Sequence, residues 1–128
     1  MTIQDQVIGA LCAWRENRGG GIAGMQSVIN VLVNRATHRG TDVYSEAIRR
    51  LQFSSMTAAG DPNLILFPTD NDPQWINALA LTSQASRGAL DDITEGSTSY
   101  YAASMLAAPY WVSSMKYTVT IEGQIFFK

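Results

Sequence analysis

The sequence has little of what metal binding and nucleophilic catalysis require. It holds one cysteine, Cys12, and one histidine, His38, among 128 residues. A single cysteine cannot form an internal disulfide, and Cys12 lies in an apolar stripe that favours a buried core thiol. A zinc site needs three or four histidine, cysteine or carboxylate ligands, so we predict neither a metal nor another cofactor.

The scarcity of histidine also narrows the possible chemistry. Catalysis of the Cys–His and Ser–His–Asp types is excluded unless His38 is the base. His38 stands beside Arg39 and Gly40, and we expect it in a solvated loop. By elimination, any acid–base chemistry should come from carboxylates.

Charge and hydropathy exclude two classes of partner. Nine Lys and Arg against eleven Asp and Glu give a net charge of −2, and no basic cluster indicates a nucleic-acid partner. No apolar run is long enough to cross a membrane, so we expect no stable membrane insertion. The N-terminal residues lack the basic and apolar blocks of a secretion signal, which predicts synthesis in the cytoplasm. The length suits one domain, 1–128, which we expect to be a monomer.

Apolar residues at helical spacing predict four helices, over residues 2–18, 23–36, 41–50 and 73–87. Thr2 and Asp5 resemble a capping box at the start of the first helix. Gly19-Gly20-Gly21 is a strong stop at its end, and Asp72-Pro73 is a cap followed by a first-turn proline. The second helix is apolar around most of its circumference, so we expect it at the centre of the fold.

The other segments predict a loop and a small sheet. Residues 55–72 are rich in Gly, Asp, Asn and Pro, and so long a loop is often one wall of a cleft. Residues 97–101 favour a strand, whereas 117–121 and 124–127, separated by Glu122-Gly123, read as a hairpin. The expected class is α+β, mainly helical with a small antiparallel sheet near the C-terminus.

Glu16 is the carboxylate in the most informative position. It lies in the last turn of the first predicted helix, one turn beyond Cys12, at the rim of the apolar face. Arg15 and Arg18 would favour its ionised form, so for a general acid we expect both to point elsewhere, with Arg18 pairing with a carboxylate or capping the helix-end carbonyls. The alternative is a solvated helix-end charge, although the helix dipole disfavours a glutamate there.

Five segments follow one another in a recognisable order: Ala10–Gly19, Gly24–Arg35, Gln52-Phe53-Ser54, Asp92–Ser97 and Ile121–Phe127. Their order and spacing resemble the SleB/CwlJ family of cell-wall hydrolases, the spore-cortex-lytic type, over nearly the whole chain. The most specific parts are Glu16–Gly19 with Asn34-Arg35, and Gln52-Phe53-Ser54. The resemblance implies a lysozyme-like fold with peptidoglycan glycan strands as substrate.

The resemblance also implies a reaction in which Glu16 matches the family's catalytic glutamate. In a lytic transglycosylase, the protonated glutamate donates its proton to the β-1,4 glycosidic oxygen between N-acetylmuramic acid and N-acetylglucosamine. The muramic C6 hydroxyl then attacks C1 while the same carboxylate acts as base, which gives a 1,6-anhydro product. One carboxyl group suffices, whereas ordinary lysozymes use two.

Three further residues match motifs of the family. Gln52 and Ser54 match its cleft motif, and we expect them to hydrogen-bond the N-acetyl groups of the sugars or Glu16. Phe53, between them, is expected in the core. Thr94 matches the turn before the aromatic strand, where it could orient the acid or the intermediate.

Aromatic residues could bind the sugar rings. Tyr100, Tyr101, Tyr110 and Trp111 are suited to stacking on pyranose faces, although such residues are often simply core. Because side chains alternate along a strand, at most one of Tyr100 and Tyr101 can line the cleft. The chain departs from the family at Gln124, where a histidine is usual, and over residues 102–114.

Two other functions stay open at this point. A hydrolysing muramidase would use Glu16 with a second carboxylate from the long loop, such as Asp61 or Asp70. A wall-binding or virion module would keep the fold without the reaction. The lack of a secretion signal and of a separate wall-binding domain suggests a phage endolysin, made in the host cytoplasm and acting in the periplasm or cell wall during host cell lysis.

Overall fold

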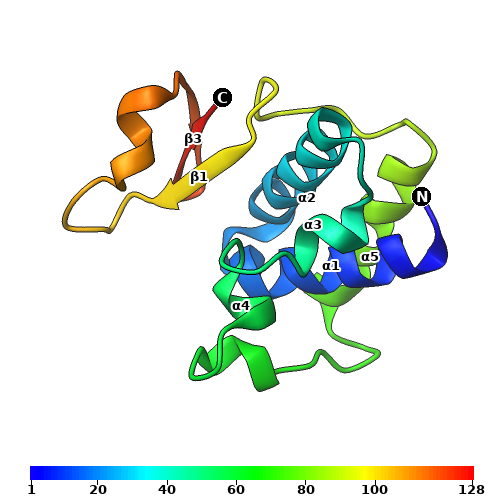
Figure 1. The fold of residues 1–128 in the computed structure, drawn as a ribbon. Helices are drawn as coiled ribbons and strands as arrows, with labels where there is room; N and C mark the ends of the chain where they lie inside the picture. Colours follow the sequence, from blue (N-terminus) through cyan, green and yellow to red (C-terminus); the bar gives the residue numbers. More distant parts are fainter.

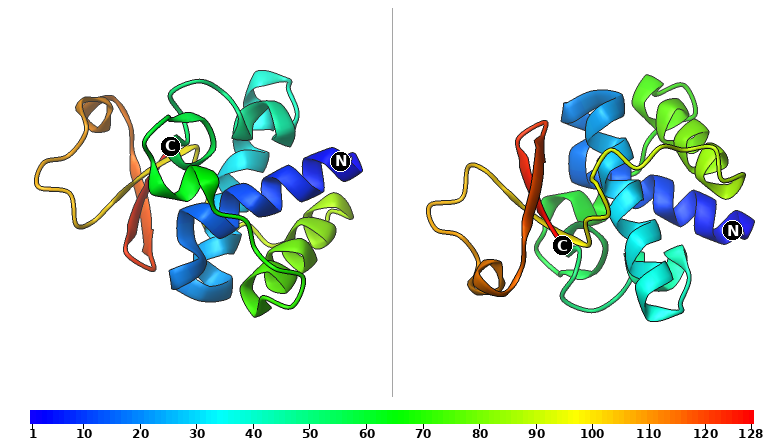
Figure 2. Two further views of the ribbon diagram at one scale, coloured as in Figure 1. Left: turned by 90° about the horizontal axis from the view of Figure 1, so that it is seen from below. Right: turned by 90° about the horizontal axis from the view of Figure 1, so that it is seen from above.

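The computed structural model describes residues 1–128, which form a helical lobe and a smaller β lobe (Figure 1). Helices α1 (Ile3–Asn17), α2 (Gly21–Arg39), α3 (Val43–Ala47) and α5 (Pro73–Ser86) make the first. Strands β1 (Ser99–Ala102), β2 (Tyr117–Ile121) and β3 (Gln124–Phe127) make the second. Figure 2 shows the sheet to one side of the helices. The α+β prediction is confirmed, and none of the helices is both long and apolar enough to cross a bilayer.

The first helix begins and ends with side-chain caps. Thr2 Oγ1 accepts a 3.0 Å hydrogen bond from the Asp5 amide, and Asp5 Oδ2 accepts one of 2.8 Å from the Thr2 amide, so the predicted capping box is confirmed. At the other end, Asn17 Oδ1 accepts from the Gly20 amide at 3.1 Å. Residues Arg18–Gly20 form one 3-10 turn, and α2 follows directly. The glycines therefore make a tight corner between the two helices.

The second helix is longer than predicted. It continues past Ala36 to Arg39 because no helix-breaking residue precedes Gly40, which ends it in the left-handed conformation (φ 65°). His38 consequently lies in the last helical turn, and the prediction of a loop there was wrong. Its side chain is exposed, as expected.

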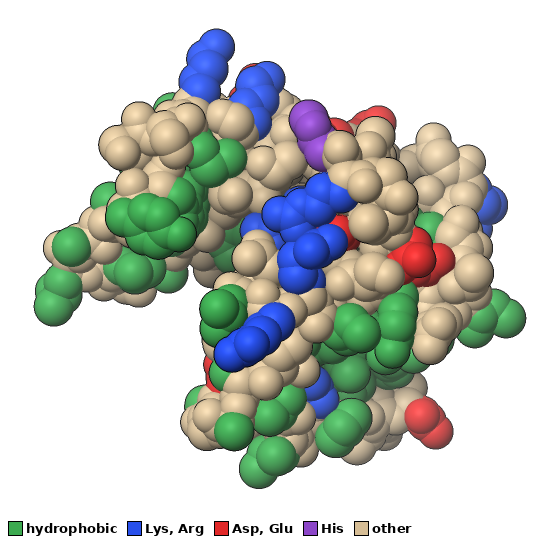
Figure 3. All heavy atoms as spheres, in the orientation of Figure 1, with side chains coloured by type: hydrophobic (Ala, Val, Ile, Leu, Met, Phe, Trp, Pro, Cys, Tyr) green, Lys and Arg blue, Asp and Glu red, His purple; other side chains and the backbone are tan.

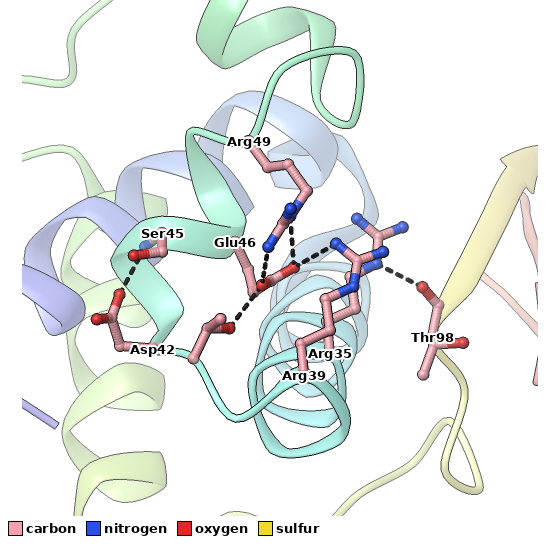
Figure 4. Close-up of polar contacts among 8 residues, drawn as sticks. Arg35, Arg39, Asp42, Ser45, Glu46, Arg49 and Thr98 are labelled. Carbon is pink, nitrogen blue, oxygen red and sulfur yellow. Dashed lines mark hydrogen bonds and ion pairs between the residues drawn. The ribbon is translucent and has the colours of Figure 1, made fainter.

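The third helix is shorter than predicted. It starts after Asp42, whose Oδ1 accepts from the Ser45 amide at 2.7 Å, and ends at Ala47. Its Glu46 carboxylate is fully buried and accepts hydrogen bonds from Thr41, Arg39 and Arg49 (Figure 4). Thr41, before α3, and Arg49, after it, both turn their side chains to this carboxylate. We attribute the shorter helix to these contacts, which hold both ends of the segment 41–50.

The predicted loop over 55–72 contains short helices. Helix α4 covers Ser54–Thr57, and the 3-10 turn η2 covers Pro62–Ile65. Asp61 joins them, because its Oδ2 accepts from Ser54 Oγ at 2.7 Å and its Oδ1 accepts from the Asn63 amide at 2.8 Å. Helix α5 then begins at Pro73, and Asp72 caps it as predicted.

The three strands are antiparallel in the order β1-β3-β2, so the last strand in the sequence lies at the centre. Glu122 (φ 44°) and Gly123 (φ 78°) turn β2 into β3, which confirms the predicted hairpin. Tyr100 pairs with Phe126 on one face of the sheet. On the other face, Tyr101 stacks on Phe127, and the 3-10 turn η3 (Tyr110–Ser114) covers them.

The core lies among α1, α2, α3 and α5, with one contribution from the segment before α4. Helix α2 supplies Met25, Val28, Ile29 and Leu32, all fully buried, so it is the central helix, as predicted. Phe53 belongs to the same cluster and is 2% exposed, which confirms its predicted core role. Cys12 is also in the core, and its burial, together with the charge of Glu16, raises the pKa of the thiol.

Candidate active site

Glu16 lies where α1, α4 and β1 meet. It is half-buried in the last turn of α1, and each of its carboxylate oxygens accepts one hydroxyl group. Ser55 Oγ donates to Oε2 at 2.6 Å, and the Tyr100 hydroxyl donates to Oε1 at 2.6 Å. Both ion pairs in the structure involve Glu46, so Glu16 takes part in none. Two neutral donors therefore hold this carboxylate.

Arg15 and Arg18 both point to other partners. Arg15 is 6% exposed, and its guanidinium donates to the backbone oxygens of Leu66 (3.1 Å) and Ser55 (3.2 Å). Burial lowers the pKa of Arg15. Arg18 donates to the Trp14 carbonyl at 3.1 Å and lies over the Trp14 ring, 4.2 Å from its centroid. The expectation that Arg18 caps helix-end carbonyls is confirmed, whereas its side-chain partner is the Asn63 amide oxygen and no carboxylate.

The serine that binds Glu16 is the neighbour of the one expected. Ser54 is exposed and donates to Asp61, so the expected contact with Glu16 is not made by Ser54. Ser55 is 2% exposed, and its hydroxyl points to Glu16 on α1. The sequence carried no signal for this difference, because the two serines are adjacent and the orientation of α4 decides which of them faces Glu16.

Tyr100 reaches Glu16 from the β lobe. Its ring packs beside Phe126 (5.3 Å between centroids) and Phe53 (6.5 Å), so the hydroxyl is directed toward the end of α1. Burial, and then the charge of Glu16, raises the pKa of Tyr100 well above its ordinary value. The phenol therefore keeps its proton and acts as a hydrogen-bond donor.

Two hollows adjoin the Glu16–Tyr100 pair. One, with a volume of about 280 Å³, is lined by residues of both lobes: Arg35, Leu51, Gln52, Ser99, Tyr100, Tyr110 and Trp111. The other, also about 280 Å³, is lined only by polar residues and glycine: Arg15, Glu16, Asn17, Arg18, Gly19 and Asn63. Figure 3 shows the surface deeply notched between the β lobe and the part that carries α4 and η2. A polymer could therefore approach Glu16 from either side.

The remaining sequence candidates divide between the cleft and the interior. Gln52 is exposed and lines the same hollow as Tyr100 and Trp111. Tyr101 faces the other side of the sheet, 6.1 Å from the Trp111 ring. Thr94 is fully buried and donates to Asp92 at 2.6 Å, so the expectation that it orients Glu16 or an intermediate was wrong.

The remaining positions raised by the sequence are Gln124 and the two aspartates of the long loop. Gln124, which replaces the usual family histidine, is half-buried in β3, and its Oε1 has no hydrogen-bond partner. Asp61 organises its own loop through Ser54 and Asn63, and these hydrogen bonds lower its pKa. Asp70 is exposed, and neither aspartate contacts Glu16. The structure contains no group of three or more His, Cys, Asp or Glu side chains arranged to hold a metal ion.

Comparison with known proteins agrees with this arrangement. A family model described as cell wall hydrolase matches residues 19–127. The match begins just after the segment that holds Glu16, so it bears on the fold and the rest of the cleft. No curated protein matches the chain.

Two solved structures have the same fold over the whole chain. The catalytic domain of the germination-specific lytic transglycosylase SleB from Bacillus anthracis is 22% identical, with a TM-score of 0.75, covering 100% of this chain and 97% of that one. The catalytic domain of the Bacillus cereus SleB protein is also 22% identical, with a TM-score of 0.76 and coverages of 100% and 92%. At this identity the likeness establishes the fold.

Proposed function

Because the chain belongs to the cell wall hydrolase family, we propose that it cleaves peptidoglycan glycan strands as a lytic transglycosylase, with Glu16 as its single catalytic residue. The family makes the chain a wall-degrading enzyme, which disfavours a non-enzymatic wall-binding or virion module. The bond, the product and the catalytic residue belong to the proposal. The similar SleB domain from Bacillus anthracis is described as a lytic transglycosylase, which supports the same reaction type here.

The observation that carries the proposal is that Glu16 has neither an ion-pair partner nor a second carboxylate in contact with it. Its carboxylate contacts two hydroxyl groups, takes part in no ion pair and has no second carboxylate among its partners. A hydrolysing muramidase needs a second carboxylate across the scissile bond, whereas a transglycosylase needs only one. The surroundings of Glu16 fit the second requirement better.

In the proposed reaction, protonated Glu16 transfers its proton to the glycosidic oxygen as the bond from C1 of N-acetylmuramic acid to that oxygen breaks. The C6 hydroxyl of the same sugar forms a new bond to C1, and its proton passes to the Glu16 carboxylate. Glu16 thus ends protonated, as it began, and no water is consumed. The products are a 1,6-anhydromuramic end and a free N-acetylglucosamine hydroxyl.

Ser55 and Tyr100 can support both halves of this cycle. A hydroxyl group can donate or accept a hydrogen bond, so both partners can hold Glu16 with or without its proton. Since Tyr100 belongs to the β lobe and Ser55 to α4, they hold the carboxylate from two different elements, between the two hollows. Gln52 and Trp111 line the hollow beyond Tyr100, where we propose that they contact the sugars. We propose that Ser54 and Tyr101 contact the glycan strand only farther from Glu16.

The test is the mass of the fragments released from purified peptidoglycan. Wild type should release 1,6-anhydro ends, and Glu16→Gln, which keeps the size of the side chain, should release none while keeping its thermal unfolding curve. Reducing ends would favour the muramidase instead, and Asp61→Asn and Asp70→Asn would then identify its second carboxylate. A Glu16→Gln protein that degrades the wall as wild type does would overturn the assignment of Glu16.

A role as a phage endolysin is a separate proposal with its own test. The protein would be produced in the bacterial cytoplasm, with and without an agent that permeabilises the inner membrane. An endolysin should lyse the cells only after permeabilisation, and Glu16→Gln should not lyse them in either case. Lysis without permeabilisation would count against this role and leave the enzymatic proposal intact.

A further inference from the structure

A third pocket lies beside the two hollows of the cleft and carries positive charge without an acidic side chain in its lining. It has a volume of about 330 Å³ between the C-terminal half of α2 and the edge of the β lobe. Arg35 and Arg39 line it from α2, and Lys128 lines it from the end of β3. The whole chain has a net charge of −2, so the charge of this pocket is opposite in sign to that of the molecule.

The cations of the pocket are only partly neutralised. Arg39 shares the Glu46 carboxylate with Arg49, so one negative charge serves two guanidinium groups. Lys128 donates to a backbone oxygen, that of Glu95, at 3.1 Å, and forms no ion pair. Arg35 and Arg39 stand four residues apart on one helix, where like charges repel each other. An anion bound between these residues would relieve the repulsion.

Arg35 gives the strongest indication that the pocket binds an anion. It is 8% exposed and has no carboxylate partner. Its Nε donates to the Thr98 backbone oxygen, its guanidinium lies 5.0 Å from the centroid of the Phe53 ring, and its buried Nη1 has no hydrogen-bond partner. Figure 4 shows the end of this side chain beside Arg39 and directed away from Glu46. A buried cation without a partner is unfavourable unless a ligand completes it.

The pocket is continuous with the cleft. Arg35, Gln52 and Ser99 line both the basic pocket and the hollow that holds Tyr100 and Trp111. A muramic acid placed at Glu16 carries its peptide stem on the lactyl group, and the stem carries free carboxylates. Guanidinium groups bind carboxylates through paired, charge-assisted hydrogen bonds. The basic pocket thus lies where a stem attached to a sugar in the cleft could reach.

We propose that the pocket formed by Arg35, Arg39 and Lys128 binds a carboxylate of the peptide stem, so that the enzyme prefers glycan strands that still carry their stems. This inference rests on the proposed cleavage of glycan strands and specifies which strands are the substrate. It makes the three cations specificity determinants rather than catalytic residues.

The test compares two soluble substrates, glycan strands with intact stems and the same strands stripped of stems by an amidase. Wild type should show a KM about tenfold lower for the strands with stems, as expected for a charge-assisted hydrogen bond to carboxylate. Arg39→Gln combined with Lys128→Gln should remove this preference, leaving kcat and the KM for stripped strands unchanged. Added salt should weaken the preference in wild type.

Arg49→Gln is the matched control. Like Arg39, Arg49 pairs with Glu46, but it does not line the pocket, so its loss removes no cation that could contact the stem and should leave a clear preference for strands with stems. Equal KM values for both substrates in wild type, or an undiminished preference in the double variant, would overturn this inference while cleavage itself still stands. If neither substrate is cleaved to anhydro ends, the proposed function fails as well.

Discussion

The hydroxyl of Tyr100 donates a 2.6 Å hydrogen bond to Oε1 of Glu16, across 84 residues of sequence. It connects the β lobe to the end of α1, and it is the only hydrogen bond that the Glu16 side chain receives from a strand. Its consequences can be separated from those of the ring, because the ring packs on Phe53 and Phe126 and the hydroxyl alone reaches the carboxylate.

Replacing Tyr100 with Phe should therefore lower activity and leave the fold intact. Loss of one hydrogen bond to a charged group corresponds to about 1.5–3 kcal/mol, or roughly a tenfold to hundredfold fall in kcat. KM should change little, since the ring remains in place. Steady-state cleavage of soluble glycan strands measures both. Tyr101→Phe, on the opposite face of the sheet, should be close to wild type.

Ser55→Ala and Ser54→Ala should differ although the residues are adjacent. Ser55→Ala removes the donor to Glu16 Oε2, and we expect kcat to fall about tenfold or more. Ser54→Ala removes a contact with Asp61 in an exposed loop, so kcat should stay within about twofold of wild type. The same cleavage assay distinguishes them. Similar losses in both variants would contradict the placement of Ser55.

The stability of the protein should fall in acid partly because of Glu46. Burial alone would raise the pKa of Glu46, but hydrogen bonds from Arg49 and Thr41 and the charges of both arginines outweigh it, so the pKa lies below its ordinary value of 4.5. A lowered folded-state pKa contributes stability that is present above pH 4.5 and lost as the pH falls through the folded-state value.

Thermal unfolding of wild type and Glu46→Gln between pH 3 and pH 7 would measure this contribution. The variant should have the lower Tm at pH 7, and the two curves should converge as the pH falls. Asp5 and Asp92 also have lowered pKa values, so the variant should keep part of the acid sensitivity. Parallel curves would show that Glu46 does not contribute in this way.

Gly24→Ala should loosen the corner between α1 and α2. A Cβ at residue 24 would lie 2.8 Å from Asn17 Nδ2 and 3.1 Å from its backbone oxygen. Relieving such overlap costs typically about 1–3 kcal/mol. Urea unfolding should show this loss, with reduced activity because Asn17 is next to Glu16. Gly19→Ala is the control: its Cβ would meet no atom within 4 Å, so its stability should match or exceed that of wild type.

The helices could largely be predicted from the sequence because their signals are local. The Thr2–Asp5 capping box, the Asp72 cap and the periodic apolar residues of α2 act within a few residues of each other. The failure at α3 came from a long-range effect. Helix α3 is shorter than predicted, and we attribute this to the buried Glu46 carboxylate, which pairs with Arg39 and Arg49. No local sequence pattern predicts these ion pairs.

The site was predictable at its centre and less so around it. Glu16 stood out because a glutamate at a helix C-terminus breaks a local rule. The orientation of the short helix α4 decides whether Ser54 or Ser55 faces Glu16. A pair of adjacent serines in the sequence does not reveal this orientation. Thr94 was misjudged because the turn before β1 turns its hydroxyl toward Asp92. Predicting which face of the sheet Tyr100 occupies would have required the strand register, in which Tyr100 pairs with Phe126.

The order of the strands also sets the sequence of events in folding. Strand β1 pairs only with β3, which is made after η3 and β2, so β1 has no strand partner while the chain is being synthesised up to residue 123. Contacts between distant residues form late because a long loop must close first. We expect a nascent chain to complete its helices before Tyr100 is held against Glu16. Glu16 would then acquire its second hydroxyl partner as one of the final steps of folding.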